Sequence, residues 1–118
     1  MEIDQTARTS RSFSRDDLAQ FARMAGVAPG DTVPEPLIGA LFSYLLGVEL
    51  PGFGTNYLKQ ELRFHDSAPA DEPLTAEVRI TRLRPEKHLV DLATTCHDSA
   101  GRLICEGSAL VLVKDVKR

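Results

Sequence analysis

Two carboxylates precede the most apolar stretch of the sequence. Asp31 and Glu35 lie in "GDTVPEP", directly before "LIGALFSYLLG", which has the composition of a helix. A carboxylate beside the first turn of a helix could act as a general base or a nucleophile, while backbone N–H groups hold an oxyanion. The same position suits a plain capping residue, because the helix dipole stabilises negative charge there. Asp31 and Glu35 are therefore weak catalytic candidates, and capping is the commoner role.

Three combinations of histidine and aspartate could supply a proton-transferring pair instead. They are His65–Asp66, His97–Asp98, and His88 with Asp91. Neighbouring residues of a strand point to opposite faces of the sheet, so the first two pairs cannot easily act together. The members of the third pair are an odd number of residues apart and diverge as well. We expect all of them to be surface or turn residues.

No cofactor is expected. The histidines have no i, i+4 pair and the cysteines lack zinc-ligand spacing, so no metal site is predicted. Cys96 and Cys105 flank the turn-like "HDSAG" and could face each other across a hairpin. In a reducing cytosol we expect two free thiols there and no disulfide.

Composition predicts one domain covering residues 1–118, a length sufficient to bury one core. The net charge of -3 argues against nucleic acid as a partner, since phosphate binding needs a concentrated basic face. The longest apolar run, "PLIGALFSYLLGVELPG", is too short and too broken to span a bilayer. The start of the sequence shows no signal-peptide pattern. A cytoplasmic protein without nucleic-acid or membrane partners is therefore expected.

Two helices are predicted. Ser14 can cap the first one, whose first turn carries two aspartates, and Gly26 can end it. Val27–Pro36 has three prolines and reads as a loop. In "LIGALFSYLLG" apolar residues cover most of the circumference, so this helix is expected to be buried. Gly47 is expected just past its end, in a left-handed conformation.

Five strands are predicted around these helices. Ala7–Phe13 can form a short edge strand, and alternating apolar residues mark four more in "TNYLKQELRF", "EPLTAEVRITRLRP", "KHLVDLATTCHD" and "GRLICEGSALVLV". The stretches "RPEK" and "HDSAG" are hairpin turns. We expect an α+β fold in which the last four strands form a meander and one curved antiparallel sheet wraps the buried helix.

The sequence resembles the MaoC-like, (R)-specific enoyl-CoA hydratases, which have the hotdog fold. "ALFSYLLGVELPGFGTNYLKQELRF" is similar to their central helix, their "LLG…LPG.G" corner and the strand that follows. "FSRDDLAQFARMAG" resembles their first helix, and the later strands match more weakly. The resemblance covers nearly the whole chain. It implies a curved antiparallel sheet around a buried central helix and a protein that handles acyl thioesters of fatty acid metabolism.

One segment departs from the family pattern. The family's catalytic Asp and His, which hold the reacting water, fall on Val27 and Asp31 when counted from the first helix. Its later "His-Gly" pair falls on Pro34 and Glu35 when counted back from the central helix. The segment between these anchors is missing here, which should open or truncate the acyl tunnel. No catalytic residue is carried over from the family.

Three functions stay open on this resemblance. The first is a hydratase-like domain that binds an acyl-CoA or acyl carrier protein thioester without hydrating it. It would act as a homodimer or as a hetero-oligomer with a related hotdog subunit. Leu37, Gly39 and Ser43 are its expected substrate-binding residues. The second is an acyl-CoA thioesterase using Glu35 or Asp31. The third is a residual (R)-specific enoyl-CoA hydratase or dehydratase.

Overall fold

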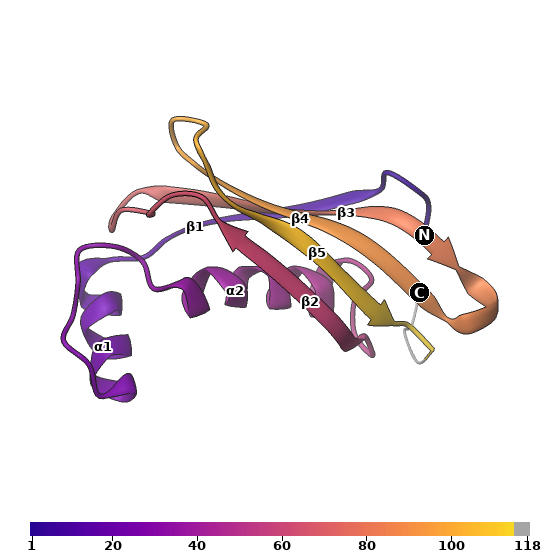
Figure 1. Cartoon of the computed structure of the whole chain (residues 1–118), viewed down its shortest axis with the longest axis horizontal. Helices are drawn as coiled ribbons and strands as arrows, with labels where there is room; N and C mark the ends of the chain where they lie inside the picture. The colour runs from indigo at the N-terminus through magenta and orange to yellow at the C-terminus, as the bar shows by residue number, and fades with distance from the viewer. Residues whose placement is uncertain (115–118) are drawn as a thin grey trace.

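The computed structural model describes residues 1–114 and contains one five-stranded antiparallel sheet, two α-helices and short helical turns. Its elements are β1 (Thr6–Ser12), α1 (Arg15–Ala25), α2 (Glu35–Tyr44), a π-helical turn (Leu45–Glu49), β2 (Asn56–Phe64), β3 (Pro73–Arg84), a 3-10 turn (Pro85–Lys87), β4 (Leu89–Asp98) and β5 (Leu103–Leu112). The sheet curves over α2, and α1 stands beyond one end of α2 (Figure 1). This arrangement confirms the predicted hotdog fold.

The strand order corrects one expectation, the meander. The order across the sheet is β1-β3-β4-β5-β2, so β2 pairs with β5 and not with β3. Only the two turns at "RPEK" and "HDSAG" make the predicted hairpins. The segment between β2 and β3 instead contacts the loop before α2: Val33 N–H donates to Ala68 O at 2.8 Å, and Thr32 bridges to Pro69. The order of strands along the sequence indicates only hairpins between successive strands. The crossover from β2 to β3 depends instead on the sheet closing around α2.

The core lies between one side of α2 and the inner face of the sheet. Ile38 and Phe42 of α2 and the following Leu45 and Leu46 are fully buried. The sheet contributes alternate residues, as expected for strands with one buried face: Leu74, Ala76, Val78, Ile80, Val90, Leu92, Ala109 and Val111. Each large side chain in this set contributes on the order of 2 kcal/mol by leaving water. This packing sets the rotation of α2 about its own axis.

One expectation about the second helix holds and one is wrong. The sheet wraps α2 as expected for a buried central helix, although Ala40, Ser43 and Tyr44 are exposed. Gly47 does not end the helix in a left-handed conformation. It lies inside the π-helical turn, and the glycines with positive φ follow later, at Gly52 (φ 109°) and Gly54 (φ 94°). Neither α-helix of the described chain combines the length and apolarity that crossing a bilayer requires.

The first helix forms as predicted. The Ser14 hydroxyl accepts from Asp17 N–H at 3.0 Å, and the Asp17 carboxylate accepts from Ser14 N–H at 2.9 Å. This reciprocal pair satisfies two backbone donors at the start of α1. Gly26 follows the helix with φ 72°, a left-handed conformation that glycine adopts readily. The predicted edge strand is also present, because β1 forms one edge of the sheet and pairs only with β3.

Gly107 on β5 allows the backbone of β2 to approach closely. A Cβ atom at this position would overlap the main-chain carbonyl oxygen of Glu61 on β2. Gly107→Ala should therefore push β2 from β5 and lower the free energy of unfolding by about 3 kcal/mol. Urea unfolding followed by circular dichroism measures this change. Gly47→Ala is the matched control: no atom lies within 4 Å of its Cβ, so equal destabilisation of both variants would contradict the prediction.

Candidate functional site

Helix α2 presents three faces with different surroundings. Ile38 and Phe42 face the sheet, as described above. Glu35, Gly39 and Ser43 recur every fourth residue and form a second face toward β2, which we call the small-residue face. The third face turns toward α1 and β1 and consists of Leu37, Ala40, Leu41 and Tyr44. The predicted binding residues are therefore divided: Gly39 and Ser43 share one face, and Leu37 lies on another.

The small-residue face has room beside β2. A Cβ atom at Gly39 would meet only the Cδ1 atom of Leu62, at 4.0 Å. One turn later, Ser43 is exposed and its side chain lies near the hydroxyl of Tyr57 of β2. Burial raises the pKa of the Tyr57 hydroxyl, and the interaction with Ser43 partly opposes that rise. Two hydroxyls thus lie together at one end of this face, next to the outer edge of the sheet.

The start of α2 offers few free backbone donors. Pro34 precedes the helix and Pro36 occupies its second position, and neither residue has an N–H group. Leu37 N–H already donates to Pro34 O at 3.0 Å. Within the first turn, only Glu35 N–H remains available to a ligand. The Glu35 side chain is exposed and forms no ion pair within residues 1–114.

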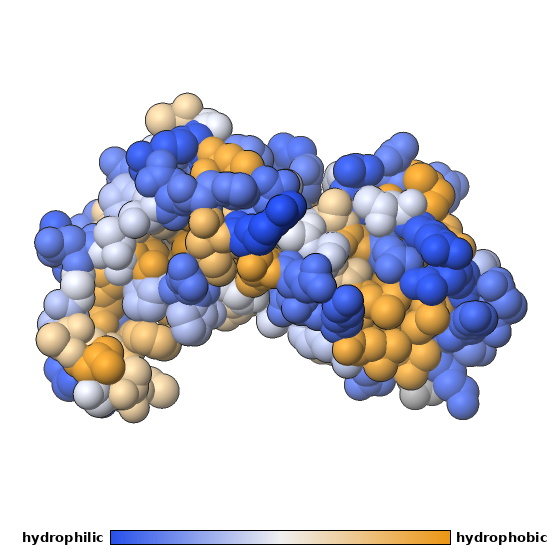
Figure 2. All heavy atoms as spheres, in the orientation of Figure 1, coloured by the Kyte–Doolittle hydropathy of each residue, from blue (hydrophilic) through white to orange (hydrophobic). Residues whose placement is uncertain are grey.

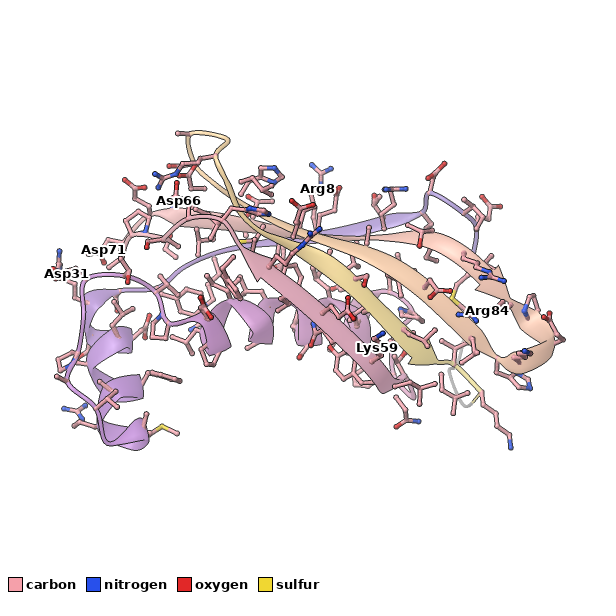
Figure 3. The ribbon with its side chains drawn as sticks, in the orientation of Figure 1. Arg8, Asp31, Lys59, Asp66, Asp71 and Arg84 are labelled. Atoms are coloured by element: carbon pink, nitrogen blue, oxygen red, sulfur yellow. The ribbon has the colours of Figure 1, made fainter. Side chains whose placement is uncertain are left out.

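The other carboxylate candidate lies away from α2. Asp31 accepts from the Arg15 guanidinium of α1 at 2.8 Å, and its side chain is 86% exposed. It points outward from the loop beside α1 (Figure 3). Asp31 pairs with Arg15, whereas Glu35 lies at the start of α2, so the two residues do not form a carboxylate pair.

None of the three predicted histidine–aspartate combinations forms a contact in the described chain. Their aspartates are held by arginines: Asp66 by Arg102 at 3.1 Å, Asp98 by Arg102 at 3.0 Å, and Asp91 by Arg84 at 2.6 Å. Asp66 lies above the side of the sheet that faces away from α2 (Figure 3). These aspartates stabilise turns and strand ends.

A different histidine contact exists that sequence reasoning missed. His65 Nε2 lies 2.7 Å from Glu106 Oε2, the one contact of this kind within residues 1–114. Glu106 alternates with Cys105 and Gly107, which face α2, so its side chain lies on the outer face of the sheet. Both side chains are more than one-third exposed. The contact joins β2 to β5, and no local sequence pattern could have indicated it.

A groove separates α1 from α2, and its floor is formed by β1 together with Phe13 and Leu41. Its volume is about 510 Å³. The lining is mainly apolar and comprises Thr9, Ser10, Arg11, Phe13, Asp17, Gln20, Phe21, Met24, Leu37, Ala40, Leu41 and Tyr44. The space-filling view is indented between α1 and the rest of the molecule (Figure 2). We call this feature the helix groove.

The two cysteines are free and buried at directly opposed positions of β4 and β5. Burial raises the pKa of Cys96 to about 12 and that of Cys105 to about 11. The charge of Glu35 contributes to the rise at Cys105, which places this thiol near the start of α2. Both groups are protonated near neutral pH and are poor nucleophiles. No group of three or more potential metal ligands occurs within residues 1–114.

No protein-family model matches the chain. It is 33% identical over 126 residues to an (R)-specific enoyl-CoA hydratase of Aeromonas caviae, covering 94% of both chains. The solved (R)-hydratase from A. caviae superposes with a TM-score of 0.86, covering 94% of this chain and 96% of the other. R-hydratase PhaJ1 from Pseudomonas aeruginosa has 28% identity, covers 95% of this chain and 81% of its own, and gives a TM-score of 0.86.

A hypothetical thioesterase protein from Streptococcus pneumoniae, solved with coenzyme A, shares the fold at 11% identity. It covers 98% of this chain and 86% of its own, with a TM-score of 0.76. The match to the A. caviae relative spans 126 positions but uses 94% of this chain, about 111 of its 118 residues. Within the match, the chain therefore lacks about 15 residues that the relative has. That they come from the connection between α1 and α2 stays a prediction.

Burial of the two thiols should protect them from modification. At pH 8 a thiol with a pKa of about 11 is ionised in roughly one molecule in a thousand, and the thiolate is the reactive form. In the native protein both cysteines should react with a chromogenic aromatic disulfide about 100-fold more slowly than in denaturant. A Ser99→Cys variant places a thiol on the exposed hairpin turn as the fast-reacting control. Rapid labelling of native Cys96 or Cys105 would contradict the assignment.

Proposed function

Because the chain belongs to the (R)-specific enoyl-CoA hydratase family, we propose that it is a single MaoC-like hotdog domain, residues 1–118, that binds an acyl thioester without hydrating it. The carrier is CoA or acyl carrier protein. Relatives named as hydratases act on enoyl-CoA, and a fold neighbour was solved with coenzyme A. These names support the thioester as the ligand class.

The observation that carries this proposal is the small-residue face of α2. Glu35 N–H is available at one end, and the Ser43 and Tyr57 hydroxyls lie at the other. Between them, Gly39 leaves space beside Leu62. A thioester carbonyl oxygen can accept from Glu35 N–H while the adjoining chain passes Gly39. This arrangement binds and orients a thioester with one backbone donor, one polar end and no obstructing side chain.

The lack of a proton-transferring pair supports binding without hydration. Adding water across a double bond needs a base to take one proton and an acid to deliver another. In the described chain the only histidine–carboxylate contact, His65–Glu106, lies on the outer face of the sheet. Removing both members of a catalytic pair leaves only positioning and electrostatics, which costs several powers of ten in rate.

Thioester hydrolysis is the second candidate, and the exposed, unpaired Glu35 carboxylate at the start of α2 favours it. Glu35 could act as base or nucleophile on a thioester bound at the small-residue face. Against this role, Pro34 and Pro36 remove two backbone donors that would otherwise stabilise an oxyanion. Asp31 is a weaker choice because it pairs with Arg15. Residual hydration is the third candidate and has no acid–imidazole pair on α2 within residues 1–114.

The proposed partner is a second hotdog subunit, either a copy of this chain or a related one. Five large apolar residues are exposed at the end of α2 and the start of β2: Tyr44, Val48, Phe53, Tyr57 and Leu58. An apolar patch is visible over the start of β2 (Figure 2). β2 is also an edge strand with unpaired backbone groups along its outer side. Pairing two β2 edges would cover this patch and enclose the small-residue face.

The proposed location is the cytoplasm. Cys96 and Cys105 lie at opposed positions of neighbouring strands and are unbridged. Free thiols in this arrangement suit a reducing compartment.

Butyryl-CoA should stabilise the native protein. A ligand that binds only the folded state adds ~2.7 kcal/mol at one hundred times its Kd, which a thermal shift measures. Gly39→Leu should abolish the shift by filling the space beside Leu62. Ala40→Leu, one residue along on another face of α2, should leave it unchanged. An unaltered thermal shift in Gly39→Leu would contradict the assignment of the small-residue face as the binding surface.

The same preparation decides between binding and catalysis. Crotonyl-CoA hydration is followed by loss of the conjugated absorbance, and thioester hydrolysis by a thiol reagent. The proposal expects binding with neither reaction. Hydrolysis that disappears in Glu35→Gln would establish the second candidate, and sustained loss of crotonyl-CoA absorbance would establish the third.

Association through β2 should depend on its apolar residues. Leu58→Lys adds a charge to the exposed patch and should shift the protein to a monomer at micromolar concentration, as measured by light scattering. Thr6→Lys places the same charge on β1, the opposite edge strand, and should not alter the mass. Equal dissociation by both variants, or by Thr6→Lys alone, would move the interface away from β2. A wild-type monomer would point to a different partner chain.

A further inference from the structure

We propose that the helix groove binds an apolar carboxylic acid, whose carboxylate pairs with the guanidinium of Arg11. This second ligand site goes beyond thioester binding at the small-residue face. The two sites lie on different faces of α2, because Ala40 and Leu41 line the groove whereas Gly39 faces β2.

The groove has the size and lining of a small-molecule site. Ligand pockets commonly enclose about 300–1,000 Å³, and the groove measures about 510 Å³. Phe13 and Leu41 form its buried floor, and Phe21 and Met24 of α1 form one wall. Met24 is 88% exposed, so a ligand that covers it removes apolar surface from water. A ligand with an apolar body would cover Met24 and Phe21 together.

Arg11 supplies the charge at the mouth of this groove. It lies opposite the buried Leu74 in the β1–β3 register, on the inner side of the edge strand. Its guanidinium carbon is 4.7 Å from the centroid of the Phe13 ring. Stacking on the ring occupies one face of the guanidinium and leaves its N–H groups free to donate in its plane.

Within residues 1–114, five of the nine arginines form an ion pair with a carboxylate, and Arg11 is not among them. Arg8, Arg15, Arg79, Arg84 and Arg102 each form an ion pair. Within residues 1–114, Arg11, Arg23, Arg63 and Arg82 do not, and Arg11 alone of these four lines the helix groove. Arg11 is exposed, so its guanidinium can pair with an anion that enters the groove without giving up an existing ion pair.

The nearby Asp17 carboxylate does not act as the ion-pair partner of Arg11. Asp17 also lines the groove, but it is committed to the capping box with Ser14. Hydrogen bonds from Ser14 are the main cause of its lowered pKa, and the charge of Arg11 is the weakest. Asp17 also limits the ligand's charge, because a multiply charged phosphate would be repelled there with only one guanidinium to balance it. A single carboxylate fits both residues, since it pairs bidentately with one arginine.

Calorimetric titration of the whole chain with decanoate tests the site, with decanol as the uncharged probe of the same length. Decanoate should bind, and decanol should bind about tenfold more weakly. Arg11→Gln should reduce decanoate affinity about tenfold and leave decanol unaffected. Arg8→Gln is the matched control on the same strand, because Arg8 pairs with Glu77 on the outer face of the sheet.

Two further variants separate this site from the thioester site. Ala40→Leu should narrow the groove and weaken decanoate, whereas Gly39→Leu should weaken only butyryl-CoA. Arg11→Gln should leave butyryl-CoA binding intact. Decanol binding as tightly as decanoate, or decanoate affinity unchanged in Arg11→Gln, would overturn the proposal. Loss of decanoate binding in Gly39→Leu would also overturn it, because the acid would then bind at the thioester site. Shielding of the groove that increases with protein concentration alone would overturn it as well, because a second copy of the chain would then cover the groove.

Discussion

The burial of one side of α2 beneath the curved sheet is the constraint on which the rest of the structure depends. Ile38, Phe42 and Leu45 have essentially no exposed surface, so the helix cannot turn about its axis without bringing a large side chain into water. Successive residues of an α-helix are about 100° apart, so this rotation also decides where every other residue of α2 points. The core therefore positions Gly39 beside β2 and Ala40 beside α1.

Helix α2 thus contributes residues to two surfaces with different chemistry. The face toward β2 offers small side chains, hydroxyls and one backbone donor, which suits a polar thioester group. The face toward α1 and β1 offers apolar side chains and a guanidinium stacked on Phe13, which suits an apolar body with one negative charge. Both surfaces are open in the single chain. The first adjoins an edge strand with an exposed apolar patch, so association would change its shape more than that of the helix groove.

The acidic side chains explain why binding is easier to support than catalysis. Asp66, Asp91 and Asp98 are held by arginines, and Asp31 is held by Arg15. A carboxylate engaged in this way stabilises a turn or strand end and is not available as a base. Glu35 is the exception, but the prolines on both sides of it leave a single backbone N–H to share a developing charge. The start of α2 can therefore orient a carbonyl group more readily than it can stabilise an oxyanion.

The sequence by itself determined the local elements: the Ser14 cap, the Gly26 stop, the hairpins at "RPEK" and "HDSAG", and the alternation that marks each strand. These features depend on residues a few positions apart, and the resemblance added the hotdog fold. Only the tertiary structure decided that β2 pairs with β5, that Leu37 faces away from Gly39, and that Arg11 stacks on the floor of a groove. Glu106 meets His65 for the same reason. Such contacts arise when the sheet closes around α2, because closure joins distant segments whose pairing no local pattern encodes.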